Sequence, residues 1–499
     1  MADPLLGTPG RQGGARHAGV ASATPIYDLG YMRQSVPWTM PDYRSLSNRI
    51  VSGTQLGYFE KVLAERSNMK SFALGIALFL STSVFGALPG VTEFSTSPEK
   101  VTDAELSALL HTHIASAHVI AIGETVHGSS GFLRIQTRLI RYLVASHGLR
   151  LIVWENPSLR SLELSRWVSA CTSVKTPVPI DVLYMPTASD SALWDWVCDF
   201  NLAHANDPIV FRGMDVWDRP WEHFLKIQMS GSRIGISSMV LNSIKTSCPA
   251  SQSSSWPEIE MIFGQLLHDG KFLPQAEYEQ CRAMLRSLLD TSRQLAQEKR
   301  KKKDPAADEA FELAMSASTI LGWLGFYNYN WSDDILSWNE RDMAQGRNLM
   351  LVMEKHNATR AILSAHTSHV SHNRSPADWW GFGDLKSGVF FFAAMTRKKV
   401  FNISLTAYEA SGTQGDWLLP TARNSVDKKL HDAGHNFSFF LSNAAFLSEH
   451  PKWWMQNGNS YGRYESGVEL TPGDHFDAFI FIKQSRLDKA LPARPMWQP

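Results

Sequence analysis

The chain has 499 residues, of which 44% are hydrophobic, so it is long enough for one large domain with insertions or for two domains. Lysine plus arginine and aspartate plus glutamate both number 48, and the formal net charge is zero. This balance gives no support for nucleic acid or a stable membrane surface as a partner, and it favours a small molecule that is recognised locally.

The first 68 residues differ in composition from the rest of the chain. Gly, Pro, Arg and Ser dominate the first third of this stretch, and no sustained periodicity begins before about Tyr58. We expect residues 1–68 to be poorly ordered or to be an upstream extension of the reading frame.

An apolar segment follows at residues 69–90. Met69 and Lys70 precede an uncharged apolar run over residues 72–88, with small residues near its end. The run is short for the ~20 residues of a spanning helix and is typical of a secretory signal peptide. We therefore expect cleavage near Gly86 and a periplasmic or secreted protein. A membrane anchor and a buried core helix are the alternatives, and the protein would be cytoplasmic if the segment is not used.

A predicted strand then ends in a Glu and a His. Residues 119–122 are apolar and mostly β-branched, and Gly123 and Gly128 bracket Glu124 and His127 in what should be a tight loop. A short helix over residues 102–113, starting with a capping-box pattern at Thr102 or Asp103, should lead into this strand.

A helix and a second strand follow with short connections. Apolar residues recur at helical spacing over residues 132–143, Gly148 is a plausible stop, and the apolar residues 149–154 end in Glu155. A strand, a helix and a strand in this order form a right-handed crossover between parallel strands. Glu124 and Glu155 should therefore lie together at the carboxyl edge of one sheet, where open α/β sheets bind ligands.

Two further strands also end in ionisable residues. Residues 208–215 end in Asp215, and residues 361–365 end in His366, with His369 close behind. The remaining elements are helices over residues 159–168, 187–201, 275–303, 306–329 and 339–354, and strands over residues 389–395, 400–406 and 476–482. The two long helices suggest an antiparallel hairpin inserted at about residues 220–335, which can serve as a lid.

Four apolar runs ending in acids or histidines indicate an active site, because parallel strands bring their carboxyl ends into one cleft. The four cysteines give less guidance. Cys171, Cys198, Cys248 and Cys281 contain no CxxC pair, which excludes a zinc ribbon or a thioredoxin-type site and leaves disulfides and free buried thiols both open.

The motifs together resemble the erythromycin esterase family. Gly123-Glu-Thr-Val-His-Gly128, the Glu155 strand end, Asn339-Glu-Arg-Asp-Met-Ala344 and Ala365-His-Thr-Ser-His-Val370 match it in order and spacing, from about residue 101 to 484. The resemblance implies a central mixed α/β sheet with a helical insertion, over a hydrolase domain of residues 91–499. It further implies hydrolysis of a macrocyclic lactone, as in antibiotic resistance, without a metal or other cofactor.

The resemblance also assigns roles to individual residues. His127 resembles the general base that activates water, Glu124 and Glu155 match the acids that orient it, and His366 matches a histidine that stabilises charge on the carbonyl oxygen. A neutral His is available near neutral pH, and a carboxylate partner favours the useful tautomer. The candidates for substrate binding are His369, Arg134, Gln136 and Asp215.

This chain departs from the family pattern at two positions. Gln136 stands where the family usually has an Arg, between Arg134 and Arg138, and Thr367 stands where the family usually has an Asn after Ala-His. The first change removes a fixed positive charge unless a neighbouring Arg replaces it. Both changes concern the macrolide substrate more than they concern hydrolysis.

Three alternatives remain. A serine hydrolase is disfavoured because the chain has no GxSxG elbow. A non-enzymatic metal- or haem-binding module is the second alternative, because the acids and histidines at the strand ends are all competent ligands. The third alternative is a hydrolase of the same fold that cleaves a different ester or an amide.

Overall fold

The computed structural model describes residues 88–172, 177–179, 182–183, 186–216, 274–329, 334–373, 385–412, 417–418, 424–456 and 467–491. All of them belong to one compact unit, Ser83–Pro499. The predictions for residues 1–68, for most of the signal-like segment and for residues 217–273 of the insertion lie outside these residues.

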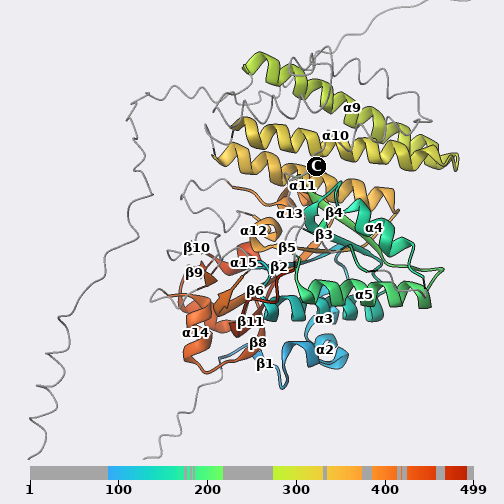
Figure 1. The fold of residues 1–499 in the computed structure, drawn as a ribbon. Coiled ribbons are helices and arrows are strands. Elements are labelled where there is room, and N and C mark those ends of the chain that lie inside the picture. Colours follow the sequence, from blue (N-terminus) through green and yellow to red (C-terminus); the bar gives the residue numbers. More distant parts are fainter. Residues whose placement is uncertain are drawn as a thin grey trace, which may run out of the picture. The chain divides into compact units, whose positions relative to one another are not determined.

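The centre of this unit is a nine-stranded mixed sheet (Figure 1). Along the sheet, the eight strands of the main path are β1 (Val91–Glu93), β8 (Phe437–Leu441), β11 (Ala478–Ser485), β6 (Val400–Ser411), β2 (Val119–Glu124), β5 (Ala361–His366), β3 (Leu151–Pro157) and β4 (Val210–Asp215). The short β7 (Trp417–Leu418) pairs antiparallel with the end of β6. A separate ribbon consists of β9 (Trp453–Gln456) and β10 (Gly467–Leu470).

The six strands from β11 to β4 are mutually parallel, and β8 runs antiparallel to its two neighbours. The predicted mixed, largely parallel sheet is therefore confirmed. One detail differs from the simplest crossover, because β5 lies between β2 and β3. The consequence is that the carboxyl ends of β2, β5, β3 and β4 meet at one edge of the sheet.

Helices cover both faces of the sheet. Ile120 and Ile122 of β2 face a core built with α2 (Asp103–Ile114), α3 (Ser130–His147), α4 (Leu162–Ser169) and α5 (Ala188–Ala203). Val119 and Ala121 face the opposite core, which includes α11 (Asp334–Lys355), α13 (Gly388–Thr396), α10 (Ala306–Tyr329) and α9 (Gln275–Lys301). This alternation explains why β2 is apolar at every position before Gly123, since both of its faces are buried.

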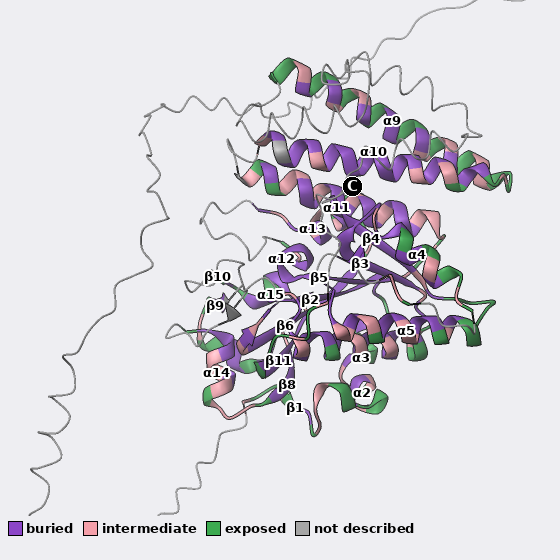
Figure 2. Cartoon of the chain, viewed as in Figure 1, coloured by how far each residue is buried: buried purple, intermediate pink, exposed green. Residues whose placement is uncertain are grey.

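The predicted helical hairpin is confirmed by α9 and α10, which lie between β4 and β5 in the chain. Helix α10 packs between α9 and α11, so the three helices stack outward from the sheet (Figure 1). Figure 2 shows the result in the burial of side chains: α10 is buried over most of its length, whereas α9 keeps an exposed outer face. An apolar sequence such as that of α10 requires this position between two layers.

Helix termini follow the expected local chemistry. Thr102 caps α2 through a capping box with Glu105, as predicted. Gly148 ends α3 in the left-handed conformation at φ +64°, which a residue without a Cβ adopts at least cost. The remaining short helices are α12 (Thr367–Val370), α14 (Val426–Asp432) and α15 (Pro472–His475), with 3₁₀ turns η2 (Pro98–Lys100) and η5 (Ala445–Glu449).

The predicted strand at residues 389–395 is wrong, because this segment is the helix α13. Ser387 caps it by accepting a hydrogen bond from the Phe390 backbone N–H, and Arg397 ends it in the left-handed conformation. The segment is apolar at nearly every position, so its sequence shows neither a helical nor a strand period. Its packing against α11 decides the outcome.

A disulfide joins Cys171, just after α4, to Cys198 in α5. Cys281 is also disulfide-bonded. For these three residues the choice between disulfides and free thiols is therefore settled in favour of disulfides, while Cys248 lies outside the described residues. Among the helices that the structure describes, none is both long enough and apolar enough to cross a membrane.

Candidate active site

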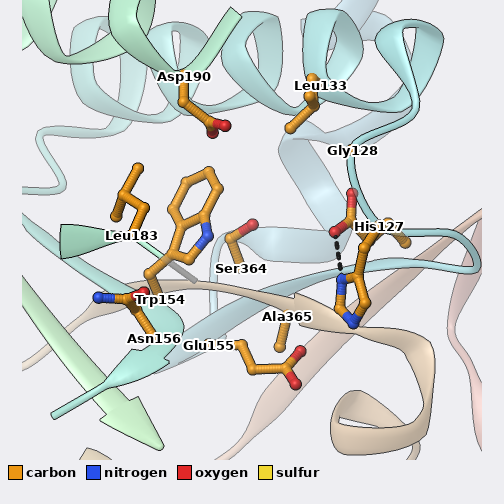
Figure 3. Close-up of a pocket in the computed structure, with 11 residues that line it drawn as sticks. His127, Gly128, Leu133, Trp154, Glu155, Asn156, Leu183, Asp190, Ser364 and Ala365 are labelled. Carbon is orange, nitrogen blue, oxygen red and sulfur yellow. Dashed lines mark hydrogen bonds and ion pairs between the residues drawn. The ribbon is translucent and has the colours of Figure 1, made fainter. Parts of the chain in front are cut away.

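A pocket of about 450 Å³, including its opening, lies at the carboxyl edge of the sheet on the side covered by α3 and α5 (Figure 3). Its wall combines three carboxyl groups, one imidazole, one hydroxyl and several apolar side chains. The lining residues are Glu124, His127, Gly128, Leu133, Trp154, Glu155, Asn156, Leu183, Asp190, Ser364 and Ala365. The ends of β2, β3 and β5 thus contribute to one pocket, whereas Asp215, His366 and His369, which the sequence placed in the same cleft, do not line it. Neither α9 nor α10 contributes a lining residue.

The predicted base lies at this pocket with its predicted partner. Glu124 is the last residue of β2, and Gly128, at φ +69°, closes the loop that carries His127. His127 Nδ1 lies 2.9 Å from Glu124 Oε1. The His127 side chain is 21% exposed and that of Glu124 is 11% exposed. The pair is therefore largely shielded from bulk water, while the His127 ring keeps some contact with solvent.

His366 packs beside His127, with 4.9 Å between the ring centroids, but it is buried and does not line the pocket. Its Nε2 lies 3.2 Å from the Thr125 carbonyl oxygen, which only accepts hydrogen bonds, so this nitrogen donates. Its Nδ1 accepts from the Ser368 backbone N–H. Both ring nitrogens are therefore engaged, and His366 holds the loop that carries His127.

Burial keeps the His366 imidazole uncharged. It lowers the pKa of this imidazole to about 3, and the neighbouring His127 ring contributes to the lowering. A ring with such a pKa is neutral at physiological pH, which agrees with one donating and one accepting nitrogen.

Glu155 lines the pocket, and its carboxylate is bonded to three groups that do not line it. Oε2 accepts a hydrogen bond from the His366 backbone N–H at 2.6 Å. Oε1 lies 3.2 Å from an Arg341 guanidinium nitrogen and 3.1 Å from His369 Nε2. Burial alone would raise the pKa of Glu155, but His369, His127 and Arg341 outweigh it and hold the pKa well below its usual range. Glu155 is therefore a fixed negative charge.

His369 carries the opposite charge. Its ring lies between Glu155 and Asp342, with 2.7 Å from Nδ1 to Asp342 Oδ1. Burial would lower its pKa, but the two carboxylates outweigh burial and raise the pKa to about 10. The buried His369 is consequently an imidazolium ion, and it does not line the pocket.

Asp215, at the end of β4, is held by α11. Arg341 donates two hydrogen bonds to its carboxylate, at 3.0 and 2.7 Å, and Gln345 donates a third at 2.9 Å. Burial lowers the pKa of Arg341, but the carboxylates of Asp215 and Glu155 outweigh it and leave the pKa above its ordinary value. Asp215 is 4% exposed and lies behind the pocket wall, so the structure places it as a support for Arg341.

The remaining sequence candidates are not among the residues that line the pocket. Arg134 is exposed on α3, with a guanidinium nitrogen 3.8 Å from Glu99. Arg138 donates to the Val101 carbonyl and pairs with Asp103. Gln136 is buried, and its side-chain oxygen accepts no hydrogen bond within the described part of the chain. Neither neighbouring arginine therefore replaces the charge that Gln136 lacks.

Several residues of the site were missed as candidates. Arg341, Asp342 and Gln345 lie four or fewer positions apart on α11 and point to the sheet edge. The Asn339-Glu-Arg-Asp motif contained the signal for the first two. Asp190 gave no such signal, because its sequence context is a helix start, where it forms a capping box with Thr187. Among the described residues, no three His, Cys, Asp or Glu side chains are arranged to hold a metal ion.

Comparison with known proteins gives both a family and a fold. Residues 144–485 match the family model described as erythromycin esterase, a range that includes Glu155, Arg341 and His369 and begins after His127. Solved structures with the same fold include a Bacillus cereus protein at 17% identity and TM-score 0.62, where the match covers 81% of this chain and 97% of that protein.

Two further structures are similar over most of their length. A succinoglycan biosynthesis protein is 16% identical with a TM-score of 0.61, and the match covers 80% of this chain and 96% of that protein. A histidine-to-asparagine mutant of the erythromycin esterase EreC, in its open conformation, is 16% identical with a TM-score of 0.55, and the match covers 78% of this chain and 96% of that protein. At these identities the three structures show a shared fold.

Proposed function

Because this chain belongs to the erythromycin esterase family, we propose that it hydrolyses the lactone ester of a macrolide, with His127 activating water and without a metal ion. Such a reaction would inactivate an antibiotic. The observation that carries the mechanism is the Glu124–His127 pair at the pocket, with 2.9 Å between Oε1 and Nδ1.

The pair sets the tautomer that a general base needs. An ionised carboxylate only accepts hydrogen bonds, so Nδ1 of His127 donates to Glu124 and Nε2 becomes the basic nitrogen. In the proposed step, Nε2 takes a proton from water while the water oxygen attacks the ester carbonyl carbon. The tetrahedral intermediate then collapses, and the bond from carbon to the alcohol oxygen breaks.

The charges around His127 favour this proton transfer. When His127 gains a proton, the resulting imidazolium faces the carboxylates of Glu124 and Glu155. Glu155 is already ionised and is held in place by Arg341 and His369, so it stabilises the new charge without rearranging. His366 keeps the loop of His127 in position through the Thr125 carbonyl.

A different ester or an amide is the second candidate substrate. The specific observation in its favour is Gln136, where the family usually has an Arg and where neither neighbouring arginine supplies the missing charge. Gln136 is buried and does not line the pocket, so this change acts on the substrate only through the residues that do, and it leaves the Glu124–His127 pair intact.

We also propose that the protein works outside the cytoplasm, in the periplasm or as a secreted enzyme. The apolar segment at residues 69–90 and the disulfide-bonded Cys171, Cys198 and Cys281 support this proposal, because disulfides persist in oxidising compartments. Mass spectrometry of the mature protein tests it. An intact chain starting at Met1 in the cytoplasm would refute it.

The proposed reaction is tested by mass spectrometry of erythromycin after incubation with the purified protein, with and without EDTA. We expect the addition of one water, unaffected by EDTA, and a loss of at least ~100-fold in turnover for His127→Ala. His204→Ala is the matched control, because His204 is exposed at the far end of α5 from Asp190 and should keep full activity.

The outcomes separate the alternatives. Activity retained in a folded His127→Ala variant would place the base elsewhere. No change in erythromycin, with hydrolysis of other esters, would favour the second candidate substrate. Stoichiometric metal that survives dialysis, together with activity lost in EDTA, would favour the metal-binding alternative over the metal-independent esterase.

A further inference from the structure

The side of the pocket formed by α5 carries an acid that the proposed mechanism does not use. Asp190 is 5% exposed and lines the pocket. Its Oδ2 accepts hydrogen bonds from the Thr187 backbone N–H at 2.9 Å and from the Thr187 hydroxyl at 2.8 Å. Within the described part of the chain, its Oδ1 accepts none. One oxygen of a buried carboxyl group is thus left for a molecule in the pocket.

A buried hydroxyl lies in the same wall. Ser364 is 1% exposed, lines the pocket from β5, and its hydroxyl has no hydrogen-bond partner among the described residues. It pairs in register with Ile122 on β2 and with Trp154 on β3, so it lies in the middle of the sheet. A buried hydroxyl without a partner costs free energy, and a substrate oxygen would recover it.

The charges that surround Asp190 favour its protonated form. The groups that act on it are Thr187, at the start of its own helix, and the carboxylates of Glu124 on β2 and Asp488 after β11; no cation of the described residues is among the main influences. Burial raises the pKa of Asp190 to about 7, and Glu124 and Asp488 add to the rise against the Thr187 hydrogen bonds. At neutral pH, a substantial fraction of Asp190 therefore carries a proton.

Asp190 and His127 reach the pocket from different elements and from different sides (Figure 3). His127 comes from the loop after β2 and Asp190 from the first turn of α5. An ester held between them would present its carbonyl carbon to the water at His127 and its alcohol oxygen to the α5 side. An alkoxide is a poor leaving group, so a proton donor on that side would accelerate the reaction by protonating the alcohol oxygen as it leaves.

We propose that Asp190 is the general acid of this site and that the Ser364 hydroxyl donates a hydrogen bond to the departing alcohol oxygen. As the carbon–oxygen bond breaks, its electron pair goes to the alcohol oxygen, which takes the proton from the Asp190 carboxyl. Asp190 is left as a carboxylate, and His127 holds the proton from water. Release of that proton to solvent and uptake of one by Asp190 restore both groups, so one water is added across the ester. This inference rests on the proposed ester hydrolysis.

The test uses the intact protein and two acetate esters as substrates, 4-nitrophenyl acetate and an alkyl acetate. The 4-nitrophenolate leaves without help, whereas the alkoxide needs a proton. For Asp190→Asn we expect a loss of about 100-fold in kcat/KM on the alkyl ester and less than about threefold on the aryl ester. Asparagine still accepts from Thr187, so the helix cap is kept. Ser364→Ala should lose about tenfold or more on the alkyl ester.

The pH profile gives a second signature. A general acid works only while it is protonated, so wild-type kcat/KM on the alkyl ester should fall as the pH rises above the Asp190 pKa of about 7. Asp190→Asn should lack that fall. Thr102→Ala is the matched control, because it removes the equivalent capping box from α2, remote from the pocket, and should leave the ratio between the two esters unchanged.

Two results would overturn the proposal that Asp190 is the general acid. One is an equal loss on both esters in Asp190→Asn, which a purely structural role of the helix cap would produce, and the other is no loss at all. In both cases an active wild type leaves the proposed hydrolysis standing. A wild-type protein that cleaves neither ester nor erythromycin would remove the hydrolysis itself, and the acid step with it.

Discussion

At the residue scale, three histidines near one pocket have three different states. His127 is partly exposed and bonded to one carboxylate, His366 is buried and neutral with a pKa of about 3, and His369 is buried between two carboxylates with a pKa of about 10. The residue type is the same in each case. What differs is the number of carboxylates within hydrogen-bond distance, because desolvation disfavours the imidazolium and adjacent carboxylates favour it.

Gln136→Arg tests the departure from the family pattern at the same scale. If the macrolide site lacks only this charge, the added positive charge should raise kcat/KM for erythromycin by up to about tenfold through its long-range electrostatic field, because position 136 does not line the pocket. Arg134→Gln is the control. Arg134 is exposed and its nearest carboxylate contact is 3.8 Å, so its loss should change kcat/KM by less than about twofold.

The measurement is mass spectrometry of erythromycin over time with both variants. An unchanged or lower rate in a folded Gln136→Arg protein would contradict a macrolide site that lacks only this charge. That result would favour a different ester as the substrate. A large loss in Arg134→Gln would restore Arg134 as a substrate-binding residue, as the sequence predicted.

At the element scale, the site depends on a few helices that lie against the sheet edge. Helix α11 supplies Arg341, Asp342 and Gln345, and its packing on β4 brings Arg341 to both Asp215 and Glu155. On the other side, α5 supplies Asp190. The Cys171–Cys198 disulfide ties α5 to the end of α4. The segment that it closes contains Leu183 and Asp190, so the disulfide constrains part of the pocket wall.

Removal of this disulfide should destabilise the protein. The bond spans 27 residues, and closing a loop of that length stabilises the folded state by about 3.5 kcal/mol in the chain-entropy model. We expect Cys171→Ser combined with Cys198→Ser to lower the free energy of unfolding by about this amount. The double variant is preferable to a reductant, because Cys281 is also disulfide-bonded.

Urea unfolding of the wild type and the double variant measures the effect, with both proteins kept oxidised. A difference below about 1 kcal/mol would contradict the chain-entropy estimate. It would indicate that residual structure already restricts the unfolded chain without the disulfide. A change in KM for the substrate would in addition report the constraint on the pocket wall.

At the scale of the whole molecule, a network of buried charges joins the ends of β3 and β4 to α11 and α12. Glu155 on β3, Asp215 on β4, Arg341 and Asp342 on α11 and His369 on α12 are connected by ion pairs. Buried charges of this kind destabilise a protein strongly when one partner is lost. The stability of the fold should therefore depend on the protonation of this network.

His369 predicts the direction of that dependence. Its pKa is about 10 in the folded protein and ~6.5 when unfolded, so the folded state binds the proton more tightly. The resulting stabilisation is complete below pH ~6.5 and is lost as the pH rises to about 10. The wild-type urea midpoint should fall between pH 7 and pH 10 by more than that of His369→Gln.

The control for this measurement is His431→Gln, at a partly exposed histidine. His431 pairs with the exposed Asp432, so its variant should follow the wild type across the same pH range. Equal slopes for the wild type and His369→Gln would contradict a buried imidazolium at position 369. A lower midpoint at all pH values in His369→Gln is expected, because Glu155 and Asp342 lose their partner.

The sequence by itself determined the features that depend on neighbouring residues. The strands ending in Glu124, Glu155, Asp215 and His366 follow from short apolar runs, and the start and end of helices follow from caps such as Thr102 and Gly148. The hairpin of α9 and α10 follows from two long helical patterns joined by a charged turn. These are local properties of the backbone and of side-chain periodicity, so they can be read along the chain.

Only the tertiary structure decided which of the convergent groups face the pocket. It placed Asp215, His366 and His369 behind the wall, brought Arg341 to two strand ends, and added Asp190 and Ser364 to the lining. It also made residues 389–395 a helix, where the apolar run had no period. Burial and charge depend on residues far apart in the chain, and they set the pKa and the exposure of each group. The role of each residue was therefore decided by contacts between helices and strands that the sequence pattern does not contain.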